Sequence, residues 1–126
     1  MRAYYSIDDT MRLALDGIEA YKNWGEYTGL GDDAEAYFTE TGALWMLGAS
    51  AADNGATRAR LAGFGVAADV LDAADLAERF PLLSAAPTPA YDRDGDELAF
   101  DGGELSALFE HGCGHLDPML CLADLL

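Results

Sequence analysis

The residue types best suited to chemistry gather in one stretch near the end of the chain, at residues 110–121. Both histidines and both cysteines of the protein lie there, and His111, Cys113 and His115 alternate with glycines. Imidazole nitrogens and thiolates are ligands that zinc prefers in proteins. Because alternate side chains of a strand share one face, a strand here would bring these three residues together. One interpretation of the stretch is therefore a small metal-binding module.

A second interpretation is a strand that leads into a helix. Structural zinc sites mostly take paired ligands from two separated segments, and no second segment of this chain supplies such a pair. Asp117 suits a helix N-cap, and Pro118 suits the first helical position, where its missing N–H costs nothing. The apolar residues that follow predict a helix over residues 118–126. We favour this interpretation, which assigns no metal ligand, because it accounts for more of the residues.

Composition limits the class of partner. The chain has 126 residues, is 51% hydrophobic, which is enough for a core, and carries a formal net charge of -16. Such an acidic surface repels nucleic-acid phosphates and anionic lipid, so we expect neither as a partner. The charge is typical of a halophilic protein, in which salt screens self-repulsion. Attraction of a cationic ligand such as an amine is the alternative explanation.

Cysteine usage and hydropathy bear on the compartment. Two cysteines, with no signal-peptide core near the N-terminus, predict a reducing, cytoplasmic setting. No apolar run approaches the ~18 residues of a membrane helix, so we expect no membrane span.

Apolar residues three or four positions apart predict several helices. These helices cover residues 7–28, 50–64, 73–79 and 118–126. Ser6 is expected to cap the first helix and Gly29 to end it, because glycine readily adopts the left-handed conformation of a C-terminal cap. Asp72 is expected to cap the third helix.

Short apolar runs between turn residues predict strands. These strands cover residues 37–39, 41–48, 67–71 and 105–109. The run at 43–47 is continuously apolar, which is typical of a strand covered on both faces. An acidic turn at 91–96 predicts a hairpin that returns through 98–100. A strand covered on both faces needs a second layer, so the chain is not all helical.

Several short motifs occur in a distinctive order. The chain has Arg-Ala-Tyr-Tyr-Ser at 2–6, Leu-Ala-Leu at 13–15 and Thr-Gly-Ala-Leu at 41–44. Ala-Asp-Leu-Ala-Glu-Arg-Phe-Pro follows at 74–81, and Gly-His-Leu-Asp-Pro at 114–118. In this order the motifs resemble the middle of an FAD-dependent oxidoreductase of the D-amino-acid oxidase superfamily, which includes sarcosine and glycine oxidases.

The resemblance implies an α+β fold with a mixed or antiparallel sheet and helices on one side, as in the substrate-binding domain of such a flavoenzyme. Residues 1–126 would then form a single partial domain. In the complete enzyme, FAD takes a hydride from the carbon next to the nitrogen of a small amine or amino-acid substrate. The resemblance places Arg2 near the flavin, and Tyr4 and Trp45 in the substrate pocket. It leaves the catalytic residues unknown.

The chain lacks the sequence by which this family holds FAD. That sequence, G-x-G-x-x-G between a strand and a helix, places the pyrophosphate at a helix N-terminus, and the C-terminal part of the family is missing as well. We therefore expect that the isolated chain does not hold FAD stably and is inactive. It would be either a truncated piece of the enzyme or a separately encoded piece that a flavin-domain partner chain completes. The alternative is a non-catalytic interaction domain that assembles through the apolar helix at 118–126, which looks cut inside the element.

Overall fold

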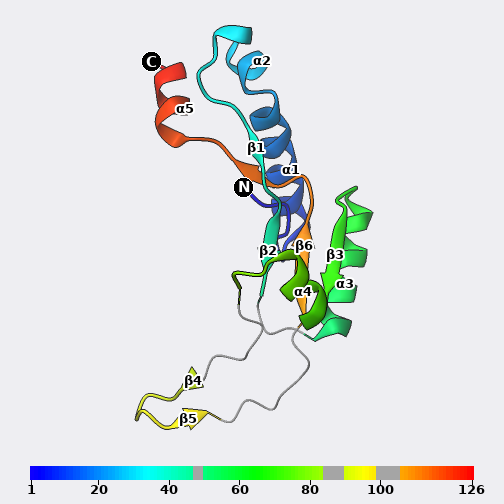
Figure 1. Cartoon of the computed structure of the whole chain (residues 1–126). Helices are drawn as coiled ribbons and strands as arrows, with labels where there is room; N and C mark the ends of the chain where they lie inside the picture. Colours follow the sequence, from blue (N-terminus) through cyan, green and yellow to red (C-terminus); the bar gives the residue numbers. More distant parts are fainter. Residues whose placement is uncertain (47–49, 84–89, 99–105) are drawn as a thin grey trace. The chain divides into compact units, whose positions relative to one another are not determined.

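The structure is a computed structural model, whose helices and strands are drawn in Figure 1. The chain divides into two compact units, each with buried residues of its own. The structure describes residues 1–46, 50–83, 90–98 and 106–126. The first unit comprises residues 1–43, 60–68 and 110–126. The second comprises residues 44–59 and 69–109.

The described ranges hold five α-helices and one short 3-10 helix. They are α1 (Asp8–Lys22), α2 (Trp24–Thr28), η1 (Gly31–Asp33), α3 (Ala51–Gly63), α4 (Ala73–Arg79) and α5 (Pro118–Asp124). All four regions predicted as helical contain helix, so those predictions are confirmed. None of the helices in these ranges has both the length and the apolar character of a membrane-spanning segment.

The first predicted helix is divided at Asn23. This residue has φ -110° and ψ 41°, outside the helical region, and it separates α1 from α2. The backbone N–H of Asn23 donates to the carbonyl oxygen of Glu19 at 3.1 Å, and its side-chain amide donates to the same oxygen at 3.0 Å. Gly29, with φ 80°, ends α2 in the left-handed conformation, as predicted.

Two of the three predicted N-caps are confirmed. The Asp72 side chain caps α4 in a capping box, and Asp117 caps α5 with Pro118 at its first position. The prediction that Ser6 caps α1 is wrong. The N-cap residue of this helix is Ile7, and no side chain caps this helix end. The hydroxyl of Ser6 therefore does not have the predicted role.

The strands are short and form three small sheets. They are β1 (Thr39–Glu40), β2 (Ala43–Trp45), β3 (Ala68–Leu71), β4 (Ala90–Tyr91), β5 (Glu97–Leu98), β6 (Ala107–Glu110) and β7 (Gly114–His115). β1 pairs with β7 and β4 with β5, both antiparallel, and β2-β6-β3 is the order of the third sheet. The α+β class and the predicted hairpin, now β4–β5, are confirmed.

The strand expected through the histidines and cysteines is interrupted. β6 ends at a turn formed by His111 and Gly112, and β7 begins only after Cys113. Gly112 has φ 73°, a conformation that costs glycine little and other residues more. Cys113 is fully buried whereas His111 and His115 are exposed, so the three side chains do not share a face.

The strand at β2 also differs from its prediction. Its three residues are half-buried, so it is not covered completely on both faces. Residues 47–48, 99–100 and 105 of the predicted strands and hairpin lie outside the described residues.

Each unit is held by its own apolar contacts. In the first unit, Met11 and Ile18 are buried on one face of α1, and the ring of Trp24 stacks on Tyr21 at 5.5 Å and on Tyr27 at 6.0 Å. In the second unit, three buried residues pack with half-buried neighbours; this cluster contains Leu71, Leu76, Ala107, Leu44, Phe80 and Phe109.

Candidate functional site

A buried carboxylate anchors the segment that precedes α1. The side chain of Glu110, at the end of β6, is fully buried. Its Oε2 accepts hydrogen bonds from the backbone N–H of Ala3 at 2.9 Å and from that of Tyr4 at 3.2 Å. A buried carboxylate is tolerated only when such partners replace water. Bonds to an ionised acceptor are also stronger than those between neutral groups.

Cys113 is a third partner of the same carboxylate. Its thiol donates to Oε2 of Glu110 at 3.2 Å. Burial, followed by this hydrogen bond and by the negative charge of Glu110, raises the pKa of Cys113 from 9.0 to about 11. The thiol is therefore protonated near neutral pH. A protonated thiol is a poor nucleophile and a poor metal ligand.

The side chains of the anchored segment are arranged around two arginines. The guanidinium of Arg2, an exposed residue, lies 4.8 Å from the ring centroid of Tyr5. The guanidinium of Arg60 lies 5.9 Å from the ring centroid of Tyr4, which is half-buried. Both are cation–π arrangements that favour one orientation of the tyrosine rings.

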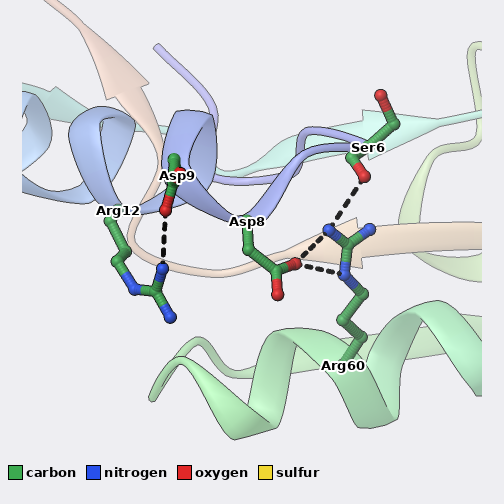
Figure 2. Close-up of polar contacts among 5 residues, drawn as sticks. All are labelled: Ser6, Asp8, Asp9, Arg12 and Arg60. Carbon is green, nitrogen blue, oxygen red and sulfur yellow. Dashed lines mark hydrogen bonds and ion pairs between the residues drawn. The ribbon is translucent and has the colours of Figure 1, made fainter.

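Arg60 also fixes the start of α1. Its Nε donates to Oδ1 of Asp8 at 3.1 Å, and its Nη2 donates to the same oxygen and to the carbonyl oxygen of Ser6 at 3.0 Å (Figure 2). A separate pair on α1, Arg12 and Asp9, joins side chains at 2.8 Å and is exposed. Glu110 thus binds the backbone of segment 2–5, while Arg60 lies on the Tyr4 ring and bonds the residues that follow the segment.

Two cavities border this region of the first unit. One, of about 410 Å³, is lined in part by Ala3, Ile18, Lys22, Val66, His111 and Cys113. The other, of about 400 Å³, is mainly apolar and is lined in part by Tyr21, Trp24, His115, Leu116, Cys121 and Leu125. The two histidines therefore border different cavities.

The metal interpretation gains no geometric support. Among residues 1–46, 50–83, 90–98 and 106–126, no three His, Cys, Asp or Glu side chains are grouped so that they could hold a metal ion. His111 and His115 are exposed, whereas Cys113 points its thiol at Glu110.

Two of the three residues that the resemblance assigned, Arg2 and Tyr4, are two positions apart in the sequence. Arg2 and Tyr4 lie on the same anchored segment of the first unit. Trp45 lies on β2, belongs to the second unit and is half-buried. Arg2 is an exposed residue, and a guanidinium is the side chain best suited to binding a carboxylate or phosphate through two parallel hydrogen bonds.

Glu110 is the residue that sequence reasoning missed. In the sequence this glutamate stands only at the start of the stretch that holds the histidines and cysteines. A signal was available, because Glu110 lies two positions after Leu108, and alternate residues of a strand share a face. Both are buried. A carboxylate on the buried face of an apolar strand requires partners, although the sequence does not say which.

Comparisons with protein-family models, with curated proteins and with solved structures find no match for this chain. The functional argument therefore depends on its own residues and their geometry.

Proposed function

We propose that this chain is the substrate-domain part of an FAD-dependent oxidoreductase that acts on small amines or amino acids. The observation that carries the proposal is the anchoring of the Arg2–Tyr4 segment. This segment is part of the motif that resembles the family's sequence near the flavin, and Glu110 binds two of its backbone amides. The order of the other motifs and the α+β class agree with the same family.

The residues of this chain fit only the edge of a flavin site. Arg2 is an exposed residue, and a guanidinium carries N–H donors suited to an anionic or carbonyl group. The pyrophosphate needs a glycine-rich turn at the start of a helix, which the sequence lacks. In the proposed enzyme, FAD would be held by a flavin domain outside these 126 residues and would supply hydride acceptance when bound.

The role of this chain is to hold and orient the substrate. The resemblance assigns Arg2 to the flavin side of the site and Tyr4 to the wall of the substrate pocket. The formal net charge of -16 favours the approach of a protonated amine over that of an anion.

The test is purification of the tagged chain from its own cells at high salt. We expect a yellow complex with a protein that carries G-x-G-x-x-G, and we expect this complex to reduce a dye when sarcosine, glycine or proline is added. Arg2→Ala should lower dye reduction by about tenfold or more, since it removes a charged contact. Arg12→Ala removes another exposed arginine and is the matched control. A chain that associates with no flavin, or a complex that no amine reduces, would refute the proposal.

Exposed apolar side chains on α5 favour a second candidate function, that of a non-catalytic interaction domain. Leu122 is 49% exposed, and Leu125 is 62% exposed. An apolar helix of seven residues needs neighbours to be stable. In this case a complex would form without flavin, and Leu122→Glu would abolish it while Arg2→Ala would not.

A further inference from the structure

Glu110 binds backbone groups and not only side chains. Two of its partners are consecutive amides, those of Ala3 and Tyr4. The first amide belongs to the peptide group that joins Arg2 to Ala3. A carboxylate that binds this group fixes the backbone to which the Arg2 side chain is attached.

The residues around the Glu110 carboxylate are buried and hydrogen-bonded, which restricts its movement. Ala3 is 1% exposed, and Glu110 and Cys113 are fully buried. The carbonyl oxygen of Cys113 accepts from the backbone N–H of Thr41 at 3.1 Å and of Gly42 at 2.9 Å, so the turn after β6 is itself held in place. An additional backbone bond, from the N–H of Gly114 to the carbonyl oxygen of Met1 at 3.2 Å, joins the beginning of the segment to β7.

We propose that Glu110 is a positioning residue for the candidate site: its buried carboxylate holds the Arg2–Tyr4 backbone and thereby sets where the Arg2 guanidinium is presented. Its role in turnover rests on the proposed function, because the place of Arg2 matters for catalysis only in an assembled flavoenzyme. The hydrogen bonds from the Ala3 and Tyr4 amides to Glu110, which we call the clamp, lie within this chain and can be tested on it directly.

The direct test is amide hydrogen exchange of the full chain, followed residue by residue by NMR. Glu110→Gln keeps the shape of the side chain but removes its charge and one acceptor oxygen. We expect exchange at Ala3 and Tyr4 to accelerate by about tenfold or more, with little change in the middle of α1. Glu110→Asp keeps the charge and should restore part of the protection. Unchanged exchange at these two amides, or a uniform acceleration across the first unit, would overturn the clamp.

Cys113→Ala is the matched control. It removes the thiol partner of Glu110 but leaves both backbone amides bound to the carboxylate. We expect Ala3 and Tyr4 to remain protected in this variant. If they exchange as fast as in Glu110→Gln, the effect is a general loosening of the core and the proposal is wrong. Should Glu110→Gln not fold, Glu110→Asp and Cys113→Ala decide between the same outcomes.

A double-mutant cycle in the flavin complex tests whether Glu110 acts through Arg2. We expect Glu110→Gln and Arg2→Ala each to lower kcat/KM for the amine, and the double variant to be no slower than Arg2→Ala alone. Effects that multiply would show a merely structural role and contradict positioning. If the wild-type complex has no amine activity, the proposed function fails, while the exchange experiment still decides the clamp.

Discussion

Asp124 on α5 accepts a 2.8 Å hydrogen bond from Nε1–H of Trp24 on α2, across 100 positions of sequence. The same carboxylate accepts from the backbone N–H of Glu35 at 2.8 Å and of Ala36 at 2.9 Å. The two backbone bonds, and then the indole bond, lower the pKa of Asp124 below its ordinary value. One carboxylate thus connects α2, the segment after η1 and α5 within the first unit.

These bonds make the stability of the first unit depend on pH. Because the pKa of Asp124 is depressed by folding, its contribution is present above the unfolded pKa of about 3.9 and is lost as pH falls through the folded value. We expect Asp124→Asn to lower the urea midpoint at pH 7, measured by Trp24 fluorescence in a Trp45→Phe background. The difference in urea midpoint between Asp124→Asn and the parent protein should become smaller below about pH 4. Asp16→Asn changes an exposed carboxylate on α1 and is the control. If the difference in urea midpoint between Asp124→Asn and the parent protein stays constant down to pH 3, the prediction is contradicted.

The core of the second unit should depend strongly on Leu76. This side chain is fully buried on α4 and packs with Leu71 and Ala107. We expect Leu76→Ala to cost about 2–5 kcal/mol in the free energy of unfolding, since it leaves a cavity. Trp45 fluorescence in a Trp24→Phe background reports this unit. Leu82, 98% exposed, supplies the control, and its change to alanine should stay within about 0.5 kcal/mol.

Local signals in the sequence were the ones that predicted structure well. Asp72 and Asp117 were assigned as caps because their partners lie within three residues. The break at Asn23 is local, but the periodicity of apolar residues does not predict it, because it depends on a polar side chain that bonds the backbone: the Asn23 amide shares the Glu19 carbonyl with the N–H of Asn23 itself.

Long-range partners were the part that the sequence could not supply. Glu110 meets Ala3 across 107 positions, and a single sequence carries no record of such a pairing. Its burial on an apolar strand was inferable, but its partner was not. The prediction of a continuous strand through His111 and Cys113 is wrong for a related reason. The only local sign of the turn is Gly112, and a glycine in a strand is equally compatible with a bulge.

Two glycines should respond in opposite directions to alanine. A Cβ on Gly114 would overlap the carbonyl oxygen of Thr39 and lie 2.7 Å from the Phe38 ring. A Cβ on Gly17, inside α1, would meet nothing within 4 Å. We expect Gly114→Ala to destabilise the first unit by about 1–3 kcal/mol, and Gly17→Ala to stabilise it by up to about 1 kcal/mol. Chemical denaturation followed by Trp24 fluorescence measures the free energy of unfolding of each variant. Equal changes in the two variants would contradict the packing argument.

Salt should stabilise the chain. Its formal net charge of -16 produces self-repulsion, which acts over about 10 Å at 0.1 M salt and about 3 Å at 1 M. We expect Tm to rise by several degrees between these concentrations of NaCl. A variant with Asp32→Asn and Asp33→Asn, both exposed on η1, should gain less, because it has less repulsion to screen. An equal gain in this variant would assign the effect to general salting-out.

Cys113 should behave as a high-pKa thiol because it is buried and, to a smaller extent, because it bonds to Glu110. Its pKa of about 11 lies above the ordinary 9.0, so folding favours the protonated form. The associated stability, roughly 2–3 kcal/mol at most, is fully present below pH 9 and is lost as pH rises through the folded pKa. We expect alkylation of the single thiol in Cys121→Ser to have its midpoint near pH 11, and Glu110→Gln to move this midpoint down because a negative charge is removed. Cys113→Ala leaves Cys121 as the matched reporter. If the Cys113 midpoint does not move in Glu110→Gln, the carboxylate is not its controlling partner, and burial alone sets the thiol's reactivity.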